Sequence, residues 1–305
     1  MDLAWPYVLF LVATILTVPL HLLISIVILT GQKLTPFYAL MLSQSVADVY
    51  LLLFYNFFTV LRVSQLCNDF FWNNRYFLAN ASYLTTYYTL YLRCIGITLI
   101  SIQRYVTVCQ SGTRVEMMMV ETPVLFFVIL HWCIALPMIA PLMTSFNVTY
   151  DAKDTMEVLV PPSSLALANM ISMVSVFILF FICVFCYVFV INHILRSRFT
   201  TNVTKRHEIR LSIQFAGLMI AFLFVFIYSI GQYVLNEMRE IDLLYDWRQL
   251  NPIMNGFLSC VQPWMCLFFN KEIRNKLKGI VGCRQKQNEP NQGSMFKQST
   301  PLSRR

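Results

Sequence analysis

Charged residues are scarce in this chain. Lysine, arginine, aspartate and glutamate make up 12% of its 305 residues, whereas hydrophobic residues make up 57%. A soluble domain usually carries about 25% charged residues. The composition therefore excludes an ordinary soluble protein and indicates an integral membrane protein.

Sequence patterns typical of catalysis or metal binding are also missing. The chain contains neither GxSxG nor HExxH, and no apolar run holds paired carboxylates, so a hydrolase acting within the membrane is not expected. His21 and His131 lie in apolar runs without a second ligand at metal spacing, and we interpret both as packing or hydrogen-bonding residues. We expect no enzyme, no catalytic residue, no metal site and no cofactor.

Seven apolar runs are each long enough to cross a bilayer, which takes about 20 residues of helix. Inside the membrane each run can satisfy its own backbone hydrogen bonds only as a helix. Because the loops are short, we expect an all-α membrane protein, a single seven-transmembrane helix bundle without a soluble domain. The runs are Pro6 to Thr30, Phe37 to Leu61, Phe77 to Val108, Thr122 to Met143, Ser163 to Leu195, Ile209 to Leu235 and Gln249 to Phe269.

The distribution of lysine and arginine predicts the orientation. If the N-terminus is outside, seventeen of the 23 cations lie on the cytoplasmic side and five lie outside. Such a bias is typical of a bundle with its N-terminus outside. The cations are divided among several loops, which favours contact with anionic lipids over nucleic-acid binding. Cys67 is then the only cysteine in the outer loops, so we expect no disulfide there.

The chain after the seventh run has a different character. Residues 271–282 place Ile273 and Leu277 on one face and lysines and arginine toward the other, which predicts a short amphipathic eighth helix on the inner leaflet. Cys283 follows at once and is either a palmitoylation site or a plain thiol. Residues 284–305 are polar without apolar periodicity, and we expect a disordered cytoplasmic tail beyond the bundle domain of residues 1–283.

Two opposite charges fall in the middle of adjacent apolar runs. Asp48 lies in the second run and Arg93 in the third, at similar depth. Because an isolated charge at that depth is costly, we predict a buried ion pair between them. The alternative is that Arg93 faces a water-filled cavity alone.

Several residues at matching intervals resemble those of rhodopsin-like (class A) G-protein-coupled receptors. Gln103-Arg104-Tyr105 is similar to the acid-Arg-Tyr triplet of the third span in that family. Residues 262–266, QPWMC, resemble its seventh-span NPxxY sequence. The other matching positions are Asp48, Trp132, Tyr187, Glu208, Phe222, Phe226, Asn270 and Arg274.

The departures from that family resemble the nematode serpentine chemoreceptors, particularly the Srg and Srv groups. Gln103 stands where the family has an acid, so Arg104 lacks its adjacent counter-charge. Arg93 stands beside the aspartate of the family's sodium site, where a guanidinium would take the place of the cation. The outer disulfide of the family is absent.

The resemblance implies a G-protein-coupled receptor, chemosensory, in the plasma membrane, including that of sensory cilia. Its partners would be a small-molecule ligand, a heterotrimeric G protein and membrane lipids. We expect the activation switch and G-protein contact at Arg104, Tyr105, Tyr187, Glu208, Phe222, Pro263 and Asn270. Two other classes of membrane protein are alternatives. A multi-pass transporter would show repeated halves, and a ligand-gated channel of the insect-receptor kind would place the N-terminus inside.

The outer half of the bundle offers a candidate ligand pocket. Helical spacing puts several aromatic residues of the third run roughly on one face, and we expect an aromatic, uncharged pocket for a small neutral or weakly polar ligand. For any one aromatic residue, simple packing between helices is the alternative. The candidates are Tyr83, Thr86, Tyr87, Leu90, Tyr91, Phe226, Tyr233 and Asn255. Asn147, in Asn-Val-Thr, is an expected glycosylation site in the second outer loop.

Overall fold

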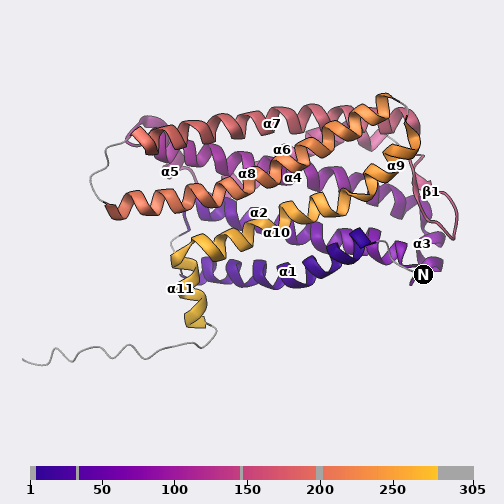
Figure 1. Cartoon of the computed structure of the whole chain (residues 1–305), viewed down its shortest axis with the longest axis horizontal. Helices are drawn as coiled ribbons and strands as arrows, with labels where there is room; N and C mark the ends of the chain where they lie inside the picture. Colours follow the sequence, from indigo (N-terminus) through magenta and orange to yellow (C-terminus); the bar gives the residue numbers. More distant parts are fainter. Residues whose placement is uncertain (1–4, 32–33, 145–146, 197–201, 239, 281–305) are drawn as a thin grey trace, which may run out of the picture.

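Seven helices run side by side along one axis of the molecule (Figure 1), which confirms the predicted seven-helix membrane bundle. The fold is taken from a computed structural model, which describes residues 5–31, 34–144, 147–196, 202–238 and 240–280. The seven helices are α1 (Trp5–Gly31), α2 (Pro36–Tyr55), α4 (Arg75–Cys109), α6 (Val124–Ile139), α7 (Pro162–Arg196), α8 (Asn202–Glu237) and α10 (Asn251–Phe269).

Helix α4 is the centre of the bundle. It packs against α2, α6 and α7, while α10 packs against α1 and α8 and closes the ring. Among the described residues, six of the seven helices have the length and hydropathy of a membrane span; α10 is less apolar because Asn255, Ser259 and Gln262 lie on its buried face. Apolar side chains cover the outside, where Ile15, Leu125 and Phe185 are 62%, 65% and 59% exposed. Such an outer surface suits lipid and not water.

The two ends of the bundle differ in their connections (Figure 1). At one end lie α3 (Asn68–Asn73), α9 (Ile241–Gln249) and a two-stranded antiparallel hairpin, in which β1 (Thr149–Tyr150) pairs with β2 (Val158–Leu159). We call it the hairpin end; α1 begins there. At the other, the α11 end, lie α5 (Arg114–Glu121) and α11 (Lys271–Ile280).

Local sequence explains several helix boundaries. Thr35 caps α2 by accepting a hydrogen bond from the Tyr38 N–H at 3.4 Å, and Pro36 follows in the first turn, where a missing N–H costs nothing. Pro252 occupies the corresponding place in α10. Before α5, Gly112 adopts a positive φ of 79°, and its N–H donates to Glu116 Oε2 at 2.6 Å.

Two spans depart from α geometry near their ends, and a third starts later than predicted. The second run leaves α geometry after Tyr55 and continues as a π-helix, η1 (Asn56–Leu61). The fourth has Pro137 inside the last turn of α6 and continues after Ile139 as a 3-10 turn, η2 (Ala140–Thr144). Gln249, predicted as the start of the seventh span, instead ends α9, because Pro252 sets the start of α10. Helices α3 and α9 and the hairpin were not predicted, since they are too short to show hydrophobic periodicity.

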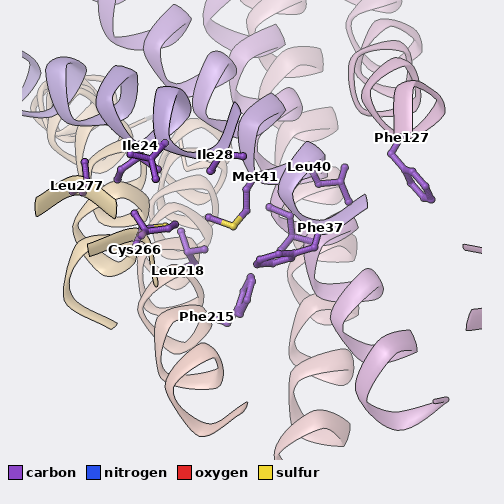
Figure 2. Packing of buried hydrophobic residues seen from close by; sticks show 13 residues of the cluster. Ile24, Ile28, Phe37, Leu40, Met41, Phe127, Phe215, Leu218, Cys266 and Leu277 are labelled. Carbon is purple, nitrogen blue, oxygen red and sulfur yellow. The ribbon is translucent and has the colours of Figure 1, made fainter. Parts of the chain in front are cut away.

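A hydrophobic cluster joins α1, α2, α8, α10 and α11 at the α11 end. Figure 2 shows Phe37 of α2 beside Phe215 of α8, with ring centroids 6.0 Å apart. Ile273 and Leu277 of α11 are 1% and 6% exposed and belong to the same cluster, so one face of α11 is buried against the bundle. Asn270 Oδ1 accepts a hydrogen bond from the Ile273 N–H at 3.2 Å and starts this helix.

Candidate functional site

The structure brings Asp48 and Arg93 together in the middle of the bundle. Arg93 Nε lies 2.9 Å from Asp48 Oδ1, and both side chains are almost fully buried, at 0% and 1% exposure. Ser259 of α10 donates to the same oxygen at 3.0 Å, and Gln44 Nε2 donates to Oδ2 at 3.3 Å. A buried pair with further hydrogen bonds is the arrangement in which two charges are tolerated away from water.

Arg93 also ties α4 to α10 through Asn255. The Nη1 group donates to Asn255 Oδ1 at 3.0 Å, and Nη2 donates to the Asn255 carbonyl at 2.8 Å. Asn255 Nδ2 in turn donates to Asn251 Oδ1 at 2.6 Å. The guanidinium therefore occupies three of its N–H groups on two helices, and the position of α10 depends on it.

A second polar cluster lies beside this pair, between α2, α4 and α6. His131 Nδ1 is 2.7 Å from Ser43 Oγ, and His131 Nε2 is 2.8 Å from the Leu92 carbonyl. Trp132 Nε1 donates to Ser43 Oγ at 3.0 Å. Gly96 faces this cluster so closely that a Cβ there would meet His131 Nε2 at 2.6 Å and would overlap Gln44 Oε1. The helices thus approach each other only because residue 96 has no side chain.

A cavity of about 600 Å³ opens at the hairpin end, a volume typical of sites for small molecules. Residues of α4, α8 and α10 form its walls, and Thr155, Glu157 and Val158 of the hairpin border it. Asn251 and Asn255 line it as well. The hydrogen bonds of Asn255 therefore connect the cavity directly with Arg93.

Five of the eight predicted ligand-binding residues line this cavity, and three do not. Tyr83, Thr86, Tyr87, Leu90 and Asn255 belong to the lining. Tyr91 lies about 80° around the helix from Tyr83 and packs instead with Ala47, Ile95 and Ala135.

The two candidates of α8 are also outside the lining. Phe226 stacks on Phe180 of α7, with ring centroids 4.7 Å apart and an interplanar angle of 8°. Tyr233 is half-buried and lies outside the lining too, whereas Gln232 and Ser229 of the same helix are part of it. Phe226 and Tyr233 were chosen because they match ligand-facing positions of the rhodopsin-like family, and that match did not predict which side of α8 faces the cavity.

The cavity is not uncharged, which corrects the sequence prediction. Arg62 and Arg248 line it together with Asp154 and Glu157. Both arginines stand directly beside a predicted span, Arg62 after Leu61 and Arg248 before Gln249. That adjacency was a usable signal, since a cation at the end of a span can turn back into the bundle.

Hydrophobic packing holds the hairpin over the cavity. Val148, Tyr150 and Met156 are buried against Phe71 and Leu142. Cys67 is exposed and, like the other described cysteines, is free. Lys153 Nζ lies 2.6 Å from Asp69 Oδ1 of α3, and this ammonium holds the pKa of the exposed Asp69 carboxyl below its ordinary value.

At the α11 end, Arg104 lies against aromatic rings. Its guanidinium carbon is 3.8 Å from the ring centre of Phe37 and 5.6 Å from that of Phe215. Tyr105 points elsewhere, toward Phe189 of α7, with ring centroids 5.9 Å apart. Tyr187 packs on the edge of the cluster that contains Phe37 and Phe215. Arg104 therefore bridges α2, α4 and α8.

The comparison with protein families agrees with this architecture. One family, described as serpentine type 7TM GPCR chemoreceptor Srv, matches residues 10–283. The chain belongs to the Srv family. The match covers α1 of this Srv chemoreceptor from residue 10 onward, the other six helices of the bundle and α11, and it confirms the expected likeness to the Srv group. A comparison with curated proteins gave no match.

The other candidate positions of this Srv chemoreceptor can be placed as follows. Phe222 is fully buried and meets Phe180 edge to face at 5.5 Å. Pro263 is buried within α10, and Asn270 ends that helix. Asn147 is exposed at the start of the hairpin segment. Cys283, the side chain of Glu208 and residues 284–305 lie outside the described part.

Proposed function

We propose that this Srv-family chemoreceptor binds a small external ligand in the cavity at the hairpin end and activates a heterotrimeric G protein at the α11 end. One observation carries the proposal: Asn255 both lines the cavity and holds two N–H groups of Arg93. A ligand that forms a hydrogen bond with Asn255 changes the hydrogen bonds that Asn255 makes with Arg93 of the central ion pair. Because the ligand then binds two arrangements of α10 with different affinity, it shifts the population between them.

The proposal sets the orientation of the bundle. The hairpin end, where α1 begins, faces outward at the plasma membrane, including that of sensory cilia, because this places most cations on the cytoplasmic side. Asn147 then lies outside, where glycosylation occurs, and α11 lies on the inner leaflet with Cys283 after it as a palmitoylation site. Epitope tags at either end, probed on intact and permeabilised cells, test this orientation. A cytoplasmic N-terminus would contradict it.

A panel assay tests the function as a whole. Cells that express the full chain are exposed to volatile and water-soluble compounds while second messengers are recorded. We expect at least one compound to produce a response and Arg104→Ala to abolish it at equal surface expression. A response that survives Arg104→Ala would contradict a role of Arg104 in G-protein coupling.

We expect Phe37→Leu to raise basal signalling. The ring of Phe37 lies 3.8 Å from the Arg104 guanidinium and supports it in the absence of an acid at position 103. Such a cation–π contact is worth about 1 kcal/mol, so its loss shifts the equilibrium toward the open α11 end about fivefold. Leucine keeps most of the apolar volume, and the measurement is second-messenger level without ligand, per receptor at the surface.

Two further variants control this prediction. Phe37→Tyr keeps an aromatic ring and should retain the basal level. Phe126→Leu removes a ring that is 52% exposed on α6 and should change nothing. Equal basal signalling in Phe37→Leu and the original chain would show that the ring does not restrain Arg104.

A further inference from the structure

The two arginines of the cavity have hydrogen-bond donors that are buried and unused. Arg62 is 8% exposed; its Nε donates to the Phe58 carbonyl at 3.0 Å, whereas its Nη1 is buried without a hydrogen-bond partner. Nε and Nη2 of Arg248 are also buried without a partner. Among the residues whose side chains the structure describes, the ion pairs are Asp48 with Arg93 and Asp69 with Lys153, so neither cavity arginine has a carboxylate of this set within 4.0 Å. Buried charged donors without an acceptor are costly.

The π-helix explains how Arg62 reaches the cavity. The helix η1 directly precedes it, and a π turn contains more residues than an α turn. The side chains that follow are therefore rotated relative to the face they would occupy in a continued α-helix. The guanidinium lies 5.2 Å from the ring centre of Tyr150, on the strand that covers this end of the bundle. Its position is thus set from two sides.

Neighbouring contacts fix Arg248 just as firmly. Trp247 Nε1 donates to the Tyr228 carbonyl at 3.1 Å, and the two rings stack with centroids 6.0 Å apart. A Cβ at position 231 would clash with the indole of Trp247, so this packing requires glycine there. Helix α9 is thereby held against α8. Arg248, in the last turn of α9, lines the cavity as a consequence.

The acidic and the basic residues of the cavity lining differ in their exposure to water. Asp154 and Glu157 lie on the hairpin and are exposed, so solvent screens them. The arginine donors are buried, where electrostatic interactions are stronger. Tyr83, Tyr87 and Leu90 supply an aromatic and apolar wall. The cavity thus combines buried cationic donors with a surface for an apolar body.

We propose that the ligand is a small organic carboxylate whose anionic group accepts hydrogen bonds from Arg62 and Arg248 and whose apolar part lies against the tyrosines of α4. A carboxylate satisfies guanidinium donors better than any neutral group, because the hydrogen bonds are charge-assisted. The proposal rests on the proposed function, for which it names the class of ligand.

The test uses the full-length receptor in lipid nanodiscs and in cells. The probes are the linear carboxylates from acetate to octanoate and benzoate, each paired with its primary amide. Thermal stabilisation reports binding, and second-messenger level reports signalling. We expect at least one carboxylate to stabilise the receptor at a concentration at least tenfold below that of its amide.

Variants assign the effect to the two arginines. Arg62→Gln and Arg248→Gln should each raise the half-maximal carboxylate concentration about 10- to 100-fold and leave the amides unchanged. Arg75→Gln is the matched control, since Arg75 lies outside the lining and stacks on Trp72 and Tyr76. If a glutamine variant does not fold, the comparison of carboxylate with amide on the original chain decides.

The possible failures are distinguishable. Absence of stabilisation by every carboxylate, or equal stabilisation by acids and amides, would overturn the carboxylate site. Signalling in response to neutral compounds would then still support a chemoreceptor. Carboxylate binding without any second-messenger response would uphold the anion site and contradict G-protein activation.

Discussion

Arg93→Ala is expected to destabilise the receptor by about 3–5 kcal/mol, because it leaves Asp48 as an uncompensated charge in the bundle. The carboxylate loses its 2.9 Å contact and cannot reach water at 1% exposure. A lone charge at the centre of a membrane helix costs about 2.5–3.5 kcal/mol even on permissive scales. The variant also releases Asn255, so α10 loses its link to α4. The thermal midpoint of the detergent-purified receptor and its surface expression measure this loss.

A double variant separates stability from signalling. Asp48→Leu combined with Arg93→Met removes both charges, and replacement of a buried pair by apolar residues is often neutral for stability. We expect the double variant to recover the thermal midpoint but not the ligand response, because the link from Asn255 is gone. Arg196→Ala, at an exposed position near the end of α7, should match the original chain. A double variant as unstable as Arg93→Ala would contradict the charge argument.

Gly96→Val is expected to cause the second large loss. A Cβ at this position already meets His131 Nε2 at 2.6 Å, and valine adds two methyl groups. Overpacking of this kind costs about 1–3 kcal/mol. Displacing His131 from the Leu92 carbonyl adds a comparable penalty for unpaired buried groups. The expected readout is a lower thermal midpoint together with reduced surface expression.

Gly217→Ala provides the matched control for this prediction. Its added Cβ would meet the end of the Met265 side chain, which is flexible and can move aside. We therefore expect a small change at position 217. A Gly96→Val receptor as stable as Gly217→Ala would show that α2, α4 and α6 can separate without cost.

Hydrophobicity and charge made much of this fold predictable. Membrane helices must be continuous apolar runs, so the seven spans were visible in the sequence alone. Asp48 and Arg93 could be paired because both lie mid-span at similar depth.

Features that depend on local backbone geometry were not predictable. The π-helix before Arg62 leaves no mark in composition, and without it Arg62 counted as an ordinary loop cation. The hairpin is held by Tyr150 and Met156 and not by a cysteine, so no sequence pattern indicated it. Tyr91 and Phe226 were assigned to the cavity from helical spacing and family position, which do not show that Tyr91 packs with Ala135 or that Phe226 stacks on Phe180.

The Asp48–Arg93 pair also determines whether the charge of Asp48 is balanced by an ion from solution or by the protein itself. Rhodopsin-like receptors, which this chain resembles, have a sodium site beside the second-span aspartate. Here the positive charge is part of the polypeptide and is fixed at a stoichiometry of one. The charge balance at Asp48 is therefore independent of the salt concentration of the surrounding fluid.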